Sequence, residues 1–221
     1  MTARGEAFLR ALGADAERLH PQLLAQMRAV APDEDRAEGV FEVAGSRFGR
    51  LSALGRPVVG PRMLVTRFGR DVPFTLIVSS GVTASGQASL DSIREFRFPG
   101  STQYITDRVT TTVRPGIVHN VLGARGRVEM LEHCSVTDEG ALRMRTRRVA
   151  LRLAGRRIPL AGIFGVAVDL EDGWDESHGR RTIRMRATNP LFGTILEYRG
   201  WYRYLDQEDG AGRAPGRSVP Q

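Results

Sequence analysis

The sequence predicts a mainly β protein (α+β): an antiparallel β-barrel or strongly curved sheet that follows two short N-terminal helices. From residue 72 onward, strand-like alternation of apolar and polar residues recurs with only short turns between the segments. No long amphipathic helix separates them, whereas a parallel sheet needs such crossovers. We therefore expect one β-rich domain over residues 1–206. A disordered tail is expected over residues 207–221, which lack apolar periodicity.

The two helices are predicted from apolar residues at helical spacing. Residues 6–12 place such residues on one side, and Gly13 ends the pattern. The second helix is expected over residues 22–30 and ends before Pro32. Its apolar side chains are Leu23, Leu24, Met27 and Val30.

The segment over residues 45–70 is irregular, because glycines and prolines interrupt its apolar residues. We expect a short helix around Leu51 and a loop that packs on the core, with a lid over a cavity as the alternative. The strands are predicted at residues 39–43, 73–80, 88–98, 102–113, 117–122, 127–136, 141–153, 165–170, 181–188 and 194–204.

The last two strands form the clearest predicted hairpin. Arginines alternate with Ile183, Met185 and Ala187 before the turn, and Leu196, Tyr198, Tyr202 and Tyr204 share one face after it. In the turn itself, the Asn189 side chain is expected to cap the backbone ahead of Pro190. Gly193 is expected to supply a positive φ. The sequence therefore assigns Asn189, Pro190 and Gly193 to a structural turn.

A register for the hairpin over residues 117–136 follows from the loop after Leu122. Taken as Gly123 to Gly126, this loop pairs Ile117 with Glu132, His119 with Met130 and Val121 with Val128. One face of the hairpin is then mostly apolar, and His119 and Glu132 are its polar members. This register predicts that His119 and Glu132 are diagonal neighbours inside the sheet.

The following hairpin turns at Asp138-Glu139-Gly140, which pairs Cys134 with Met144 and Val136 with Leu142. The inner face then continues through Leu142, Met144 and Thr146, and Arg143, Arg145 and Arg147 point outward. The apolar parity changes at Arg147-Arg148, which predicts a β-bulge.

The candidate ligand-binding residues are those that this scheme and the last hairpin place on the inner face. A carboxyl group removed from water next to an imidazole is suited to acid–base work, so His119 and Glu132 are also the catalytic candidates. A structural hydrogen bond between them is the alternative. The ligand-binding set is His119, Met130, Glu132, Met144, Tyr198 and Tyr202.

Neither a metal nor a nucleotide cofactor is expected. His133 and Cys134 are adjacent on a strand and point to opposite faces, so they cannot share one ion. The chain also lacks the glycine-rich phosphate loops of nucleotide-binding proteins. Trp174 is expected to anchor a loop against a barrel rim.

The charged residues and the N-terminal sequence indicate which partners and which cellular compartment to expect. The net charge is +7, yet every basic residue is arginine, and most alternate along strands as on a solvated sheet face. Nucleic-acid binding, which uses clustered basic residues, is therefore not expected. The N-terminus lacks an apolar signal segment. The longest apolar segment, residues 158–168, is too short to span a bilayer. Cys134 is the single cysteine and therefore has no disulfide partner within the chain. We expect a cytoplasmic protein.

Several segments resemble the bacterial family called domain of unknown function 4166. They are FLRALGADAERLHPQL near the N-terminus, GRDVPF, REFRFP, and TNPLFG followed by YRGWY. The resemblance spans about residues 6–204. Members of that family can be attached to NAD-dependent oxidoreductase or epimerase-like domains, so it implies an oxidoreductase as a candidate partner.

These observations leave three functional hypotheses. The first is a binding module whose barrel holds an apolar small molecule or lipid. The second is an acid–base enzyme of isomerase or hydrolase type that uses the interior His119 and Glu132. The third is an accessory interaction domain of an NAD-dependent oxidoreductase.

Overall fold

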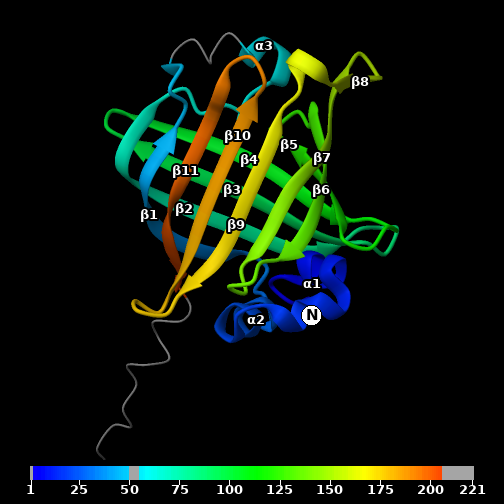
Figure 1. The fold of residues 1–221 in the computed structure, drawn as a ribbon, viewed down its shortest axis with the longest axis vertical. Helices are drawn as coiled ribbons and strands as arrows, with labels where there is room; N and C mark the ends of the chain where they lie inside the picture. Colours follow the sequence, from blue (N-terminus) through cyan, green and yellow to red (C-terminus); the bar gives the residue numbers. More distant parts are fainter. Residues whose placement is uncertain (1, 50–54, 206–221) are drawn as a thin grey trace, which may run out of the picture.

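The computed structural model describes residues 2–49 and 55–205, and ten antiparallel strands of this part form a closed barrel (Figure 1). Strands that follow each other in sequence pair with each other, and β1 with β11 and β7 with β9 complete the ring. The eleventh strand, β8, pairs with β7 beside the ring. The barrel strands are β1 Asp35–Gly45, β2 Phe68–Val82, β3 Ala88–Phe98, β4 Ser101–Thr111, β5 Ile117–Leu122, β6 Val128–Val136, β7 Leu142–Leu153, β9 Ala167–Asp175, β10 Arg180–Asn189 and β11 Gly193–Tyr204.

The predicted fold class is confirmed, and the two N-terminal helices are present. Helix α1 spans Glu6–Leu12, as predicted, and α2 spans Pro21–Arg28, so it begins one residue earlier and ends two residues earlier than expected. A 3-10 helix, Gly13–Arg18, connects them. The helix expected around Leu51 lies outside the described residues, and so does the tail expected over residues 207–221.

One end of the barrel is covered by α1, the 3-10 helix and α2, which we call the floor (Figure 1). Leu19, Leu23 and Met27 from the floor are buried against strand residues such as Val118 and Leu142. The backbone N–H of His20 donates to the Gly140 carbonyl at 2.8 Å, so the floor is also fixed to the β6–β7 turn. Gly140 has φ +78°, and a Cβ there would collide with His20, which explains why glycine is required.

The opposite end of the barrel is bounded by loops, which we call the rim. The rim comprises residues 46–49, 55–67, 123–127, 154–165 and 190–193. It includes α3 (Arg56–Val59), β8 (Arg156–Leu160) and a second 3-10 helix (Gly162–Phe164). Strand β8 was not among the predicted strands, because its two leading arginines, its proline and its mostly exposed residues show no alternation of buried and exposed positions.

Two other details differ from the sequence-based expectation. Strand β9 extends to Asp175, beyond the predicted end at residue 170, so Trp174 lies within a strand rather than in a loop. The Trp174 ring stacks on His20 of the floor, with ring centroids 6.1 Å apart. Pairing with β10 continues through Gly173 and Trp174 to Asp175, which explains the greater length of the strand.

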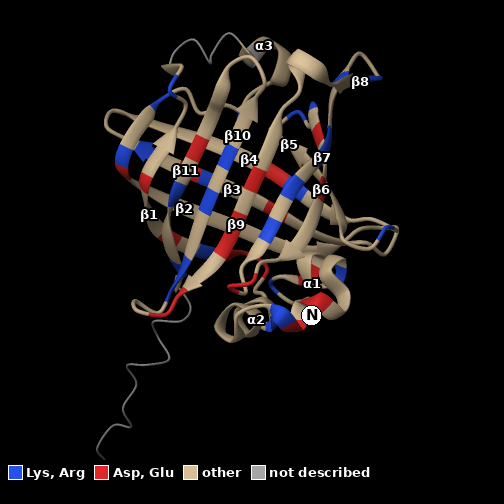
Figure 2. Cartoon of the chain, in the orientation of Figure 1, with Lys and Arg blue, Asp and Glu red and all other residues tan. Residues whose placement is uncertain are grey.

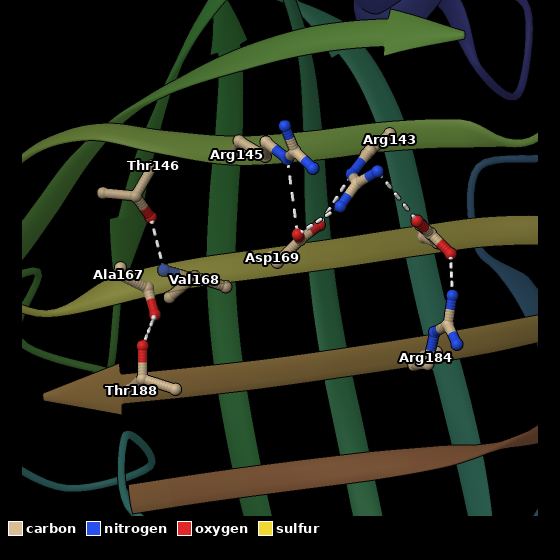
Figure 3. A network of polar contacts seen from close by, with 9 residues as sticks. Arg143, Arg145, Thr146, Ala167, Val168, Asp169, Arg184 and Thr188 are labelled. Atoms are coloured by element: carbon tan, nitrogen blue, oxygen red, sulfur yellow. Dashed lines mark hydrogen bonds and ion pairs between the residues drawn. The ribbon is translucent and has the colours of Figure 1, made fainter. Parts of the chain in front are cut away.

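The outer surface of the barrel is lined by ion pairs between neighbouring strands. Arg143 on β7 contacts Asp169 on β9, and Arg184 on β10 pairs with Glu171 of β9 (Figure 3). Arg145 adds a 3.3 Å contact to Asp169. These ladders agree with the prediction that Arg143 and Arg145 face outward.

Candidate functional site

The barrel encloses a cavity of about 750 Å³. Aliphatic, methionine and aromatic side chains from nearly every strand line it, while Phe8 and Met27 of the floor close one end. Phe48 and Phe192 line the other end and are also exposed to solvent, so the cavity reaches the outside at the rim. A volume of this size lies within the range of small-molecule sites, and ten strands are enough for a barrel with a ligand-sized interior.

The register predicted for the β5–β6 hairpin is wrong by one residue. Ile117 pairs with His133, His119 with Leu131 and Leu122 with Val128. The connection therefore covers residues 123–127, one residue more than assumed, and Gly123 and Gly126 both take positive φ within it. Because side chains alternate along a strand, this single-residue shift moves the odd-numbered side chains of β5 to the outside.

His119 consequently lies on the outer face, and the predicted interior pair of His119 and Glu132 does not form. His119 Nε2 is 3.5 Å from Glu129 Oε2, and Arg152 and Arg157 also contact this carboxylate. The residue of β5 that faces the cavity beside Glu132 is Asn120. The acid–base hypothesis in its predicted form is therefore wrong.

The second predicted hairpin is confirmed. Cys134 pairs with Met144 and Val136 with Leu142, and the register shifts where Leu131 pairs with Arg148 but Glu132 with Thr146. This shift is the β-bulge expected at Arg147-Arg148. Five residues of the predicted ligand-binding set line the cavity, although their role in binding stays a prediction. They are Met130, Glu132, Met144, Tyr198 and Tyr202.

A polar cluster interrupts the apolar lining on the inner faces of β3 to β6. Asp107 accepts hydrogen bonds from Ser92 Oγ at 2.6 Å and from Arg94 Nη1 at 2.9 Å. Asn120 Nδ2 donates to Glu132 Oε2 at 2.9 Å. We call these residues, Ser92, Arg94, Asp107, Asn120 and Glu132, the upper cluster.

The upper cluster contains unused hydrogen-bonding capacity. Glu132 is 2% exposed, and within residues 2–49 and 55–205 its only hydrogen bond is the one from Asn120. The buried Asn120 Oδ1 has no partner in this part of the chain. Asp107 is neutralised by Arg94, but Glu132 has no cation in contact among these residues. A ligand in the cavity would therefore meet a carboxyl group and an amide oxygen that are both available.

Burial controls the protonation of Glu132. Removal from water raises its pKa to about 7, and the Asn120 hydrogen bond and Arg94 oppose the rise while Asp107 adds to it. The side chain therefore changes between neutral acid and carboxylate near neutral pH. As an acid it can donate a hydrogen bond into the cavity, and as a carboxylate it can only accept.

A second polar cluster lies near the floor, and each of its charged groups has an opposite charge in contact. Arg181 Nε is 3.2 Å from Asp172 Oδ1, and the Tyr202 hydroxyl donates to the same carboxylate at 3.1 Å. Arg4 forms an ion pair with Asp35, and its guanidinium lies 3.9 Å from the centre of the Tyr204 ring. We call Arg4, Asp35, Asp172, Arg181, Tyr202 and Tyr204 the lower cluster.

Most polar residues of both clusters were missed by the sequence analysis, although a signal for them exists. Arg181 has the same strand parity as the inward Ile183 and Met185, and Arg94 has that of Phe96 and Phe98. A charged residue at an inward position of a strand is therefore the informative pattern. Most arginines were expected on a solvated sheet face, and these two inward-facing ones were not distinguished from them.

The β10–β11 turn is held by the Asn189 side chain. Its Oδ1 accepts from the N–H groups of Leu191 and Phe192, and its Nδ2 donates to the carbonyls of Ile163 and Gly165, each at 2.8 Å. Gly193 closes the turn with φ +66°. Asn189 therefore fixes two rim loops to each other.

Residues 2–49 and 55–205 contain no cluster of three or more histidine, cysteine, aspartate or glutamate side chains that could hold a metal ion. None of the helices there combines the length and the apolar composition that a bilayer span requires.

Comparison with known proteins gives two results. A family model described as "Domain of unknown function (DUF4166)" matches residues 19–202. The chain is also similar to "Uncharacterized protein YndH" of Bacillus subtilis (strain 168), with 22% identity over 191 residues. The aligned region covers 86% of this chain and 93% of the relative. The family match begins just before α2 of the floor and ends within β11, so it includes nearly all of the barrel wall around the cavity.

Proposed function

This chain belongs to the family described as Domain of unknown function (DUF4166), and we propose that its barrel is a binding module for one apolar small molecule or lipid. The observation that carries the proposal is the cavity of about 750 Å³ with its predominantly apolar lining. Enclosing an apolar molecule removes its surface from water, which stabilises the complex by roughly 25 cal/mol per Å² of apolar area.

The upper cluster supports a more specific description of the ligand. Asn120 Oδ1 and Glu132 offer hydrogen-bond acceptors that the described chain leaves unused. Two carboxyl groups, Asp107 and Glu132, share the cluster with the single cation Arg94. A negatively charged ligand would add a further anion to this buried site, which is costly. We therefore propose a ligand with an apolar body and a polar end that donates hydrogen bonds, such as a hydroxyl or ammonium group.

The first test measures whether the cavity holds a ligand. Native mass spectrometry of the purified protein should show a co-purified apolar molecule, and a fluorescent apolar probe should bind in the emptied barrel. Met130→Trp should reduce probe affinity by about tenfold or more, since the larger ring occupies space inside the cavity. The matched control is Leu131→Trp, because Leu131 is the next residue on β6 and does not line the cavity. Equal probe affinity in the two variants would contradict the binding proposal.

The second test addresses the polar end of the ligand. Alcohols, amines and carboxylic acids with the same alkyl chain would be compared as competitors of the probe. The proposal expects the alcohol or the amine to compete better than the acid at pH 8, and Glu132→Gln to reduce this preference. A preference for the carboxylic acid at that pH would exclude the proposed role of Glu132.

A further inference from the structure

The rim concentrates exposed apolar side chains on one end of the molecule. Ile163 and Phe164 are 59% and 71% exposed, and Leu191 and Phe192 are 65% and 60% exposed. These residues belong to two loops that the Asn189 side chain joins. Phe48 adds a third loop, because its ring centroid lies 6.0 Å from that of Phe192. Large exposed apolar residues gathered in this way indicate an interaction surface.

The charge of the rim differs from that of the floor. The rim segments contain several arginines, among them Arg47, Arg62, Arg125 and Arg156, and no aspartate or glutamate. The floor and the turns next to it instead combine arginines, such as those at 10, 18, 28 and 114, with acidic residues, including those at 15, 17, 138, 139 and 176. Figure 2 shows the same asymmetry, with blue but no red segments in the loops at the rim end. The apolar residues therefore lie in a positively charged surround.

Apolar side chains within a basic surround match the surface of an anionic bilayer. The aromatic and aliphatic groups can enter the boundary between headgroups and acyl chains, while arginines contact lipid phosphates. The rim also holds the end of the cavity that reaches the outside, through Phe48 and Phe192. A molecule leaving the bilayer would thus meet the entrance of the barrel directly.

We propose that the rim docks reversibly on anionic lipid bilayers, with Ile163, Phe164 and Leu191 as the inserting residues. The floor, where acidic residues and arginines are mixed, faces away from the bilayer in this arrangement. The proposal goes beyond ligand binding, because docking requires only surface residues of the rim.

The test is co-flotation of the protein with vesicles. Binding is expected to vesicles of phosphatidylcholine mixed with phosphatidylglycerol, and it should weaken with added salt and on phosphatidylcholine alone. The double variant Phe164→Ser/Leu191→Ser should bind about tenfold more weakly, because neither residue lines the cavity and both lie at the inserting surface. Arg156→Ser should also weaken binding to the anionic vesicles.

The matched controls lie at the other end of the barrel. Val82 and Val113 are 54% and 95% exposed, and their neighbouring turns contact α1. The variants Val82→Ser/Val113→Ser and Arg114→Ser should bind vesicles as the parent does. Met130→Trp, with its filled cavity, should also keep vesicle binding, so failure of ligand binding and failure of docking are distinguishable.

Three results would overturn the proposal. One is no binding to anionic vesicles, and another is equal binding by the rim variant and the parent. The third is self-association that the rim variant abolishes, in the absence of vesicle binding, since the rim would then be an interface between two copies of the chain. Sedimentation velocity over a range of protein concentrations measures this last outcome.

Discussion

The barrel interior contains two polar clusters that are built on opposite principles. In the lower cluster every charge has an opposite charge in contact, and tyrosine rings cover the two guanidinium groups. In the upper cluster, Glu132 and Asn120 keep unused hydrogen-bonding capacity beside the cavity. Charges that are paired within the protein are costly to separate and less available to a ligand, whereas unused hydrogen-bonding capacity lowers stability and leaves groups available for binding. The comparison assigns structural support to the lower cluster and recognition to the upper one.

The largest loss in the free energy of unfolding is expected when an ion pair of the lower cluster is broken. Arg181→Met removes the cation and leaves the Asp172 carboxylate buried without its partner, so we expect a loss of about 3–5 kcal/mol in the free energy of unfolding. Arg184→Met is the matched control. Arg184 lies on the outer face of the same strand and is 68% exposed, so its loss should change stability by less than about 1 kcal/mol. Urea unfolding of both variants measures the difference, and similar losses in both would refute the structural assignment.

A smaller change in stability, which depends on pH, is expected from the titration of Glu132 in the upper cluster. Burial first of all raises the pKa of Glu132 from 4.5 to about 7, so between these values the folded protein keeps a proton that the unfolded chain has lost. Stability therefore falls as pH rises through this window, by about 3 kcal/mol, and the loss is complete above pH 7. Glu132→Gln should remove this part of the pH dependence.

The control for this pH experiment is Glu129→Gln, on the outward face of the same strand. Burial opposes ionisation of Glu129, but Arg157, His119 and Arg152 outweigh it and lower its pKa. The Glu129 side chain is therefore ionised in both states over most of the range between pH 5 and 7, so its own titration should contribute little slope in that window. Unfolding free energies measured across this range test both expectations. A slope that persists in Glu132→Gln would show that another group is responsible.

The smallest change in stability is expected from the substitution Asn120→Leu. The variant removes an unpaired buried oxygen together with one hydrogen bond to Glu132, so the two changes in stability oppose each other and the net change should be within about 1 kcal/mol. Because that hydrogen bond lowers the pKa of Glu132, the pKa should rise in the variant. Carbon-13 NMR titration of the Glu132 carboxyl measures it. A lower pKa would mean that Asn120 does not stabilise the charged form.

The fold was predictable because its strands alternate clearly. Tyr198, Met185 and Met144 were assigned inward from parity alone, and all three line the cavity. The position of His119 was not predictable, since it depends on one extra residue in the turn over residues 123–127, and turn length is set by backbone conformation rather than by apolar pattern. Arg94 and Arg181 were missed for another reason: their charges are neutralised by Asp107 and Asp172, which lie on other strands, and the sequence does not show those contacts.

The closure of the barrel also has a consequence for the order of folding. Most strands pair with the strand before or after them, so these hairpins can form soon after their residues are synthesised. The pairing of β7 with β9 skips only β8, whereas the pairing of Asp35–Gly45 with Gly193–Tyr204 joins the first strand to the last. Until that ladder forms, the inner faces remain open to water and the edges of β1 and β11 are unpaired. The cavity is thus a late product of folding, and the nascent chain cannot hold a ligand before its last strand has joined the first.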